Sequence, residues 1–294
     1  MPTEQYSIDL QGVPGILATL LISASLAAAV LLFILLIARP LQWTAMRADM
    51  DRRPWSLRHI GMLATTIACG ILAMNLSYTI ACKAGGSYWQ FPEYSWLAVS
   101  MVFVHLPCLG AIWLITRREH ISLDDGFGLK LGAETPKLLA IGAFLTLATL
   151  PIVALITVPY LRFLQSLGVQ CDPQSVALMI QNTADTPWPV RIAVGALAAI
   201  LVPAIEELVF RGVAFPALAR RFGTLPAAIL ISLVFAVMHE EVPTYAPLFV
   251  LSMVFCIAYA RTGSLLVPFA MHATHNLIQI ALLPFVELHS GSAS

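Results

Sequence analysis

Three ionisable residues lie within an apolar run at positions 205–211, which reads IEELVFR. Glu207 and Arg211 are four residues apart with the acid first, which is the favourable order for an ion pair along a helix. Glu206 is turned by about 100° from Glu207, because an α-helix has 3.6 residues per turn. Charged side chains are costly in lipid and usually line a protein interior or a wet cavity. We therefore predict that Glu207 and Arg211 support a site as an ion pair and leave Glu206 available for chemistry.

Two later apolar segments carry histidines. His239 follows Phe235 by four positions, and Asn276 follows His272 by four, so the two residues of each pair share one helical face. Phe235 is predicted to support the site and not to take part in the chemistry. A carboxylate, two imidazoles and a carboxamide supply a general base and donors for a developing oxyanion. The preferred interpretation is that Glu206 and His239 hold and deprotonate a water, while His272 and Asn276 bind the oxygen of the tetrahedral intermediate. This is the chemistry of amide hydrolysis.

A metal site is the alternative use of the same groups. Zinc accepts histidine and carboxylate ligands, and a catalytic zinc keeps three of them and a water. Glu206, His239 and His272 would be those three ligands. The sequence has no HExxH motif, and it reveals no carboxylate that would orient each histidine, although Glu240 and Glu241 follow His239 directly. Metal-free activation of water is the preferred mechanism, with a divalent metal such as zinc as the alternative cofactor.

Two functions other than hydrolysis use buried polar residues in the same way. Chains of acids and histidines also build proton or solute pathways, and such a relay usually spreads through the membrane thickness. Here the polar groups are concentrated in the C-terminal half of the chain. A non-proteolytic membrane scaffold is the other alternative, since an ion pair between Glu207 and Arg211 is also expected of a purely structural helix contact.

The composition is that of a membrane protein. Of 294 residues, 59% are hydrophobic and 11% are charged, against roughly 25% charged in a soluble domain. The net charge is zero, which argues against a nucleic-acid partner. Only helices are expected to span the bilayer here, because open strands leave backbone groups without partners in lipid. The predicted class is therefore an all-α, polytopic membrane protein in which the bilayer lipids are themselves a partner.

Apolar runs predict eight membrane segments with the site in the C-terminal ones. The loops after the first and third segments are rich in arginine and lysine and should be cytoplasmic, whereas the two ends of the chain are poor in them. Both termini are thus expected on the non-cytoplasmic side. The eight segments cover about residues 13–38, 60–82, 95–116, 138–159, 189–210, 225–239, 245–260 and 264–285.

Breaks between the last segments are marked by FGTLP at 222–226, HEEVP at 239–243 and ARTGSLLVP at 260–268. From Pro226 to His239 the helix is about 21 Å long, which is too short to cross a hydrocarbon layer of roughly 30 Å. A helix end at that depth is tolerated where it lines a cavity.

The stretch 160–188 is expected to be an interfacial connector. The predicted divisions are 1–135 for three helices and a cytoplasmic linker, 136–187 for a fourth helix and connector, 188–285 for a catalytic core and 286–294 for a tail.

Three motifs resemble those of the CPBP family of intramembrane proteases, which includes type II CAAX prenyl endopeptidases and bacteriocin-processing proteins. EExxxR matches residues 206–211, FxxxH matches 235–239 and HxxxN matches 272–276. YARTGSL at 259–265 also resembles the link that precedes the last family motif. The resemblance covers about residues 188–285, and the first 130 residues match no family that we can name.

The resemblance implies an intramembrane endopeptidase acting on a membrane-associated protein or peptide. It assigns the water to Glu206 and His239 and the oxyanion to His272 and Asn276. Family members are described both as metalloproteases and as glutamate-type, metal-independent proteases, so the cofactor stays open. Arginine outnumbers lysine 13 to 3. This ratio favours a bacterial source, so the expected location is a bacterial plasma membrane and the expected role is peptide processing.

Overall fold

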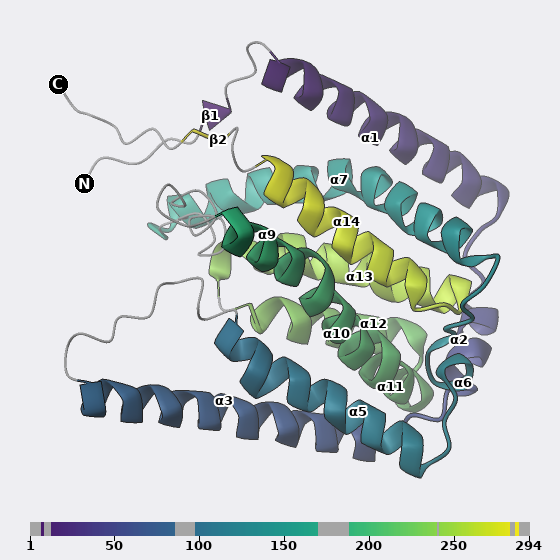
Figure 1. Cartoon of the computed structure of the whole chain (residues 1–294). Helices are drawn as coiled ribbons and strands as arrows, with labels where there is room; N and C mark the ends of the chain where they lie inside the picture. Colours follow the sequence, from purple (N-terminus) through teal and green to yellow (C-terminus); the bar gives the residue numbers. More distant parts are fainter. Residues whose placement is uncertain are drawn as a thin grey trace.

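The computed structural model describes residues 7–8, 13–85, 98–169, 188–239, 241–282 and 286–287. Helices make up almost all of the described chain (Figure 1). The strands in the described part are β1 (Ser7–Ile8) and β2 (Val286–Glu287), which pair antiparallel near the two ends of the chain. The prediction of an all-α, polytopic fold is confirmed.

Six helical segments are long and apolar enough to cross a membrane. The protein is therefore an integral, multi-pass membrane protein. Each of the six corresponds to one of the eight predicted segments, and the other two are shorter helices, α12 (Thr224–Val237) and α14 (Leu266–Leu282). The predicted count of eight crossings is thus not established. The six spans are Leu17–Ala38 in α1 (Val13–Ala38), Leu57–Lys83 in α3 (Leu57–Gly85), Ala98–Arg118 in η2 (Met101–His105) and α5 (Leu106–Arg118), Thr135–Ser166 in α7 (Thr135–Ser166), Pro189–Phe222, and Val242–Thr262 in η5 (Val242–Thr244) and α13 (Tyr245–Thr262).

The three predicted breaks in the C-terminal half are present. α12 begins after Gly223, whose φ of 91° belongs to the left-handed region that favours glycine. It ends at Val237 after 14 residues, about 21 Å, so it is as short as predicted relative to a hydrocarbon layer of roughly 30 Å. α13 ends at Thr262 and is followed by Gly263 with a φ of 66°, a common way to terminate a helix.

The segment from residue 188 to residue 222 is a helical run interrupted by two wider, π-helical turns. α9 (Trp188–Ala196) is followed by a π-turn, η3 (Leu197–Leu201), and then by α10 (Val202–Glu207). A second π-turn, η4 (Leu208–Ala214), leads into α11 (Phe215–Phe222). Pro203 and Pro216 lie at the starts of α10 and α11. Proline has no N–H to donate to the turn before it, and π-turns are frequent at functional sites.

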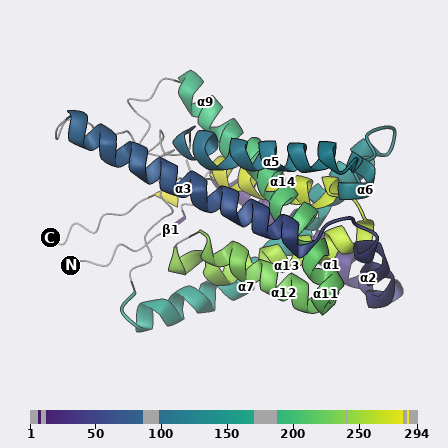
Figure 2. The same cartoon turned by 90° about the horizontal axis from the view of Figure 1, so that it is seen from below.

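The helices of this C-terminal half lie between two flanking pairs. α1 packs against α7 on one side, and α3 packs against η2 and α5 on the other (Figures 1 and 2). α7 approaches α14 closely at Gly142, where an added Cβ would lie 2.6 Å from the Ala270 Cβ. The Thr146 hydroxyl donates to the Met271 carbonyl oxygen across the same interface at 3.0 Å. α7 therefore fixes the position of α14, the helix that carries the HxxxN motif.

A short helix from the first half of the chain, α6 (Leu123–Phe127), holds one end of the C-terminal helices. Its Phe127 is buried, and its ring leaves no room for a Cβ at Gly212 of η4, which would lie 2.7 Å away. The Leu265 N–H donates to the Phe127 carbonyl oxygen at 3.1 Å. Arg53 donates to the Gly263 carbonyl oxygen at 2.5 Å and to the Asp124 carbonyl oxygen at 2.6 Å. Residues from the first half of the chain thus help to fix the positions of the helices that carry the three motifs.

The division into four parts remains a prediction. α7 continues to Ser166, so the residues from 160 onward begin as helix and not as a separate connector. The remainder of the predicted connector from residue 170, and most of the predicted tail, fall outside the described residues. α2 (Trp43–Asp51) occupies part of the first arginine-rich loop and packs against α11.

Candidate active site

The predicted ion pair of Glu207 and Arg211 is present and completely buried. The Arg211 Nη1 donates to the Glu207 Oε1 at 2.8 Å, and both side chains have an exposed fraction of 0%. The Arg211 Nη2 donates to the Ser252 Oγ of α13 at 2.7 Å. A buried charge is tolerated when it is paired and hydrogen-bonded. The two charges therefore join η4 and α10 to α13 inside the protein.

Two phenylalanine rings enclose the buried charge. The Arg211 guanidinium carbon lies 4.6 Å from the ring centroid of Phe235 and 5.1 Å from that of Phe255, within the range of cation–π attraction. The same two rings contact His272, at centroid distances of 5.8 and 5.4 Å. Phe235 comes from α12 and Phe255 from α13. These rings shape an apolar wall around the polar groups, consistent with the supporting role predicted for Phe235.

His272 is held between the two adjacent glutamates. Its Nδ1 lies 2.9 Å from the Glu207 Oε1, so Glu207 accepts hydrogen bonds from Arg211 and from the imidazole with the same oxygen. Its Nε2 lies 3.8 Å from the Glu206 Oε2, which is beyond direct hydrogen-bond reach and in the range where a small molecule can bridge the two atoms. The carboxylate at Nδ1 keeps a proton on that nitrogen and fixes the ring orientation. The Nε2 atom is directed toward Glu206.

Glu206 and Glu207 have different surroundings although they are adjacent. The Glu206 side chain is 21% exposed, against 0% for Glu207. Glu206 makes no hydrogen bond to any residue within the described ranges, and the His272 Nε2 lies 3.8 Å from its Oε2. The helical turn between the two acids therefore places them in different surroundings, and their predicted roles remain predictions. The carboxylate that can receive a proton from a substrate or a water is that of Glu206.

His239 lies just after the end of α12 and is partly exposed. Its Nδ1–H donates to the Phe235 carbonyl oxygen at 2.8 Å, which leaves Nε2 as the nitrogen that can accept a hydrogen bond. Its ring lies 4.7 Å from that of Phe235. His239 and His272 therefore contact the same phenylalanine. Along the described stretches of the chain, Glu206 forms no direct bond with His239, so the predicted contact of these two groups with one water remains a prediction.

Asn276 lies one turn after His272 on α14. Its Nδ2 donates to the Ala198 carbonyl oxygen of η3 at 2.9 Å. A carboxamide has two N–H donors, so this bond leaves the second one available. The contact ties α14 to the π-turn that precedes Glu206. The hydrogen bond to Ala198 holds the Asn276 carboxamide in a fixed orientation. The predicted oxyanion role of Asn276 remains a prediction.

The metal alternative meets one requirement and misses another. Both imidazoles have the Nδ1 partner that metal-binding histidines usually show, namely Glu207 for His272 and the Phe235 carbonyl for His239. The sequence revealed no carboxylate that would orient each histidine. In the structure His272 has such a carboxylate, Glu207, whereas His239 has a backbone carbonyl. However, within the described residues no three His, Cys, Asp or Glu side chains are grouped so that they could hold a metal ion. Glu206, His239 and His272 therefore do not form a three-ligand metal site in this arrangement.

Several residues that position these groups were not found from the sequence. Ser252 and Phe255 lie on α13, an apolar helix without a motif of its own. The only sequence feature that could have indicated a polar contact there is a serine within an apolar run. Thr146 and Gly142 of α7, which fix α14, had no signal at all, because their role depends on a contact between distant helices. Phe127 lies between two of the predicted membrane segments, in a stretch whose sequence indicated only its positive charge, whereas the structure places it in α6.

Comparison with known families agrees with the motifs. Residues 187–278 match the family model described as Type II CAAX prenyl endopeptidase Rce1-like. No curated protein and no solved structure gives a significant match. The matched segment contains EExxxR, FxxxH and HxxxN together with the helices that bring them into contact. Residues 187–278 are therefore similar to the Rce1-like type II CAAX prenyl endopeptidase family, as the three motifs predicted.

Proposed function

We propose that this protein is an intramembrane endopeptidase that hydrolyses a peptide bond of a membrane-associated protein or peptide, with Glu206 as the general base. The observation that carries the proposal is the arrangement of Glu207, His272 and Glu206. A fully buried, charge-paired carboxylate orients one imidazole nitrogen, and the opposite nitrogen lies 3.8 Å from a partly exposed carboxylate. A base beside an oriented donor is what addition of water to a carbonyl requires.

In the proposed mechanism, Glu206 and the His239 Nε2 hold a water. Glu206 removes a proton as the water oxygen forms a bond to the carbonyl carbon. The carbonyl oxygen becomes an oxyanion. Its two donors are the Nε2–H of His272 in the imidazolium form, whose Nδ1–H is held by the Glu207 carboxylate, and the remaining Asn276 N–H. Collapse of the intermediate breaks the carbon–nitrogen bond, and Glu206 returns the proton to the leaving amine. The attacking oxygen and the oxyanion share one carbon, so the base and the oxyanion donors must be neighbours, as Glu206 and His272 are.

The direct test is peptide cleavage by the purified protein in proteoliposomes. The family name suggests a farnesylated peptide ending in a CAAX sequence as the first substrate, with the same peptide lacking the farnesyl group as a second. We expect the His239→Ala variant to lose activity by at least tenfold. His105→Ala is the matched control, because His105 is also a histidine in a helix whose Nδ1 contacts a backbone carbonyl, at 3.1 Å. Full activity of His239→Ala would remove His239 from the mechanism. If neither peptide is cut by the wild-type protein, the proposal does not hold for this class of substrate.

Chelators are expected to leave the activity unchanged, because no described group of three ligands converges on one point. The measurement is the cleavage rate before and after incubation with 1,10-phenanthroline and dialysis, together with metal analysis of the purified protein. A loss of activity that added zinc restores would contradict this expectation and favour Glu206, His239 and His272 as ligands.

The Asn276→Ala variant is expected to lose about 2.7–4 kcal/mol of transition-state stabilisation, as for loss of one oxyanion donor. The loss should fall on kcat and not on KM, because the oxyanion exists only in the transition state and intermediate. Asn75→Ala is the control, since Asn75 also donates from its amide to a backbone carbonyl within a span, at 2.9 Å. An increase in KM with unchanged kcat would assign Asn276 to substrate binding.

A further inference from the structure

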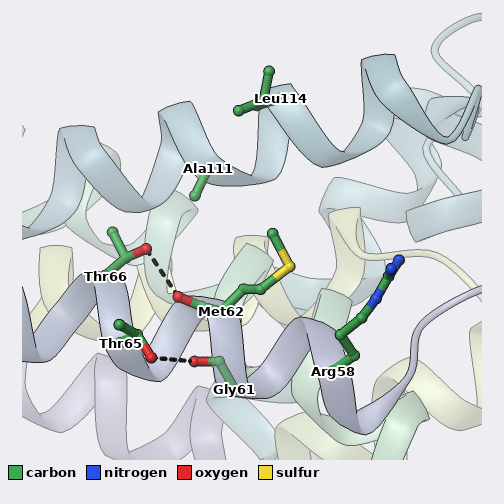
Figure 3. A pocket seen from close by; sticks show the side chains of 7 residues that line it. All are labelled: Arg58, Gly61, Met62, Thr65, Thr66, Ala111 and Leu114. Atoms are coloured by element: carbon green, nitrogen blue, oxygen red, sulfur yellow. Dashed lines mark hydrogen bonds between the residues drawn. The ribbon is translucent and has the colours of Figure 1, made fainter.

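An open groove lies between α3 and α5, on the side of the molecule away from α1 and α7 (Figures 1 and 3). Its volume of about 560 Å³ is in the range of roughly 300–1,000 Å³ typical of small-molecule sites. Both helices belong to candidate membrane spans, so the groove opens to the bilayer. Its walls are Gly61, Met62, Thr65 and Thr66 from α3 and Ala111 and Leu114 from α5, with Arg58 at one end.

The groove exists because the two helices meet at one end and are bridged at the other. At Gly70 an added Cβ would lie 2.1 Å from the Phe103 carbonyl oxygen, so the backbones are in contact there. Toward α6 the helices separate (Figure 2). Beyond the groove, Arg58 and His59 of α3 both bind the Glu119 carboxylate, which directly follows α5. The hollow is therefore enclosed between a fixed helix contact and a fixed set of ion pairs.

Apart from Arg58 at its end, the groove wall offers a ligand no free hydrogen-bond donor. The hydroxyls of Thr65 and Thr66 donate to the carbonyl oxygens of Gly61 and Met62, one turn earlier in the same helix (Figure 3). Polar wall atoms are thus already paired, and the remaining wall is aliphatic or thioether surface. An occupant inside the groove must be apolar, and a hydrocarbon chain satisfies this condition.

The end of the groove has the opposite character. Arg58 is exposed and uses Nη2 for Glu119 and His59, while its Nε and Nη1 bind no residue among those described. Arg117 and Arg118, in the last turn of α5, directly precede Glu119. Three arginines and one glutamate give this end of the groove a net positive charge. The same end of the groove lies at the ends of both membrane spans, where a lipid headgroup would lie. Arginine donors with spare N–H groups match a phosphate.

We propose that the groove is a binding site for an anionic phospholipid, with one acyl chain between α3 and α5 and the headgroup phosphate on Arg58. The positive end of the groove favours an anionic headgroup. The aliphatic walls, whose hydroxyl donors are already engaged, favour an acyl chain. The site is separate from Glu206 and His272, and the proposal does not depend on peptide hydrolysis.

The test is native mass spectrometry of the detergent-solubilised full chain titrated with phosphatidylglycerol or phosphatidylcholine of identical chains. We expect phosphatidylglycerol to bind at least tenfold more tightly. Gly61→Leu should weaken that binding by at least tenfold, because a Cβ at Gly61 meets open space and the new side chain fills the groove. Gly110→Leu is the matched control, since Gly110 is also an exposed helical glycine with open space at its Cβ but does not line the groove. Arg58→Gln should abolish the preference for the anionic lipid while phosphatidylcholine binding stays the same.

Three outcomes would overturn the proposal. They are equal binding of the two lipids by the wild-type protein, equal binding by the Gly61→Leu and Gly110→Leu variants, and full competition by glycerol phosphate, which would indicate a phosphate site that needs no chain. Thr65→Phe fills the same groove from the next turn and repeats the test with a second side chain. Helical content by circular dichroism must match the wild-type protein in each variant, so that a loss of binding reports on the groove.

Discussion

Replacement of Glu206 by glutamine is expected to abolish peptide cleavage while leaving the fold intact. Glutamine has nearly the same shape as glutamate but cannot take a proton from water, and removal of a general base costs roughly 10²–10⁴-fold in rate. Glu206 is 21% exposed and makes no hydrogen bond to the described part of the chain, so neutralising it breaks no structural contact. The expected result is a fall of at least a hundredfold in kcat, with the thermal stability of the wild-type protein.

The measurement is the initial rate of peptide cleavage in proteoliposomes, with circular dichroism and thermal unfolding recorded on the same preparation. Glu134→Gln is the matched control, because Glu134 is an exposed glutamate whose side chain pairs, within the described part of the chain, with Lys137 at the start of α7. Retention of more than a tenth of the wild-type rate by Glu206→Gln would mean that another group is the base. The second candidate is then His272, whose Nε2 faces the same space.

The local features of the site were predictable because they depend on short spacings along the chain. The i, i+4 relation of Glu207 and Arg211 predicted their ion pair, and the pair is present at 2.8 Å. The same spacing placed Phe235 beside His239, where the rings lie 4.7 Å apart. Glycine and proline at the breaks predicted where α12 begins and ends. Each of these inferences uses helical geometry over one or two turns.

The contacts between helices were not predictable, since periodicity says which face of a helix is apolar but not which helix it meets. The bond from His272 to Glu207 joins positions 65 residues apart, and that of Asn276 to Ala198 joins positions 78 apart. The sequence suggested that Glu207 only paired with Arg211, whereas the same oxygen also orients His272. Pro203 is a visible helix breaker, yet its effect here is a wider turn within a continuing helix and not an end.

The first half of the chain lies outside the family match, yet it is part of the site's architecture. The match begins at residue 187, and the contacts of Phe127 with Gly212 and of Arg53 with Gly263 come from before it. Gly212 follows Arg211 directly, and Gly263 precedes the helix that carries His272. A fragment cut at residue 187 would therefore lose these contacts with the residues beside its own motifs.

Replacement of Arg211 by methionine is expected to destabilise the protein by about 3–5 kcal/mol, because removing one partner of a buried pair leaves the other charge without compensation. Glu207 has an exposed fraction of 0%, and its Oε2 already lacks a hydrogen-bond partner among the described residues. Without Arg211 its remaining described partner is His272. The measurement is the free energy of unfolding from a denaturant titration in detergent micelles. Arg221→Met is the matched control, since Arg221 is an exposed arginine on the adjoining α11, and it should change the free energy by less than about 0.5 kcal/mol.

The double variant Glu207→Gln, Arg211→Met separates a charge effect from a packing effect. If the uncompensated carboxylate causes the loss, neutralising it as well should recover part of the stability, so the double variant is more stable than Arg211→Met alone. Residues that act as one unit give such non-additive results, with coupling energies of about 0.5–3 kcal/mol. If the two substitutions instead add, the loss comes from the contacts of Arg211 with Phe235, Phe255 and Ser252. Neither variant is expected to cleave peptide, because Glu207 can orient His272 only while it keeps both its charge and its place.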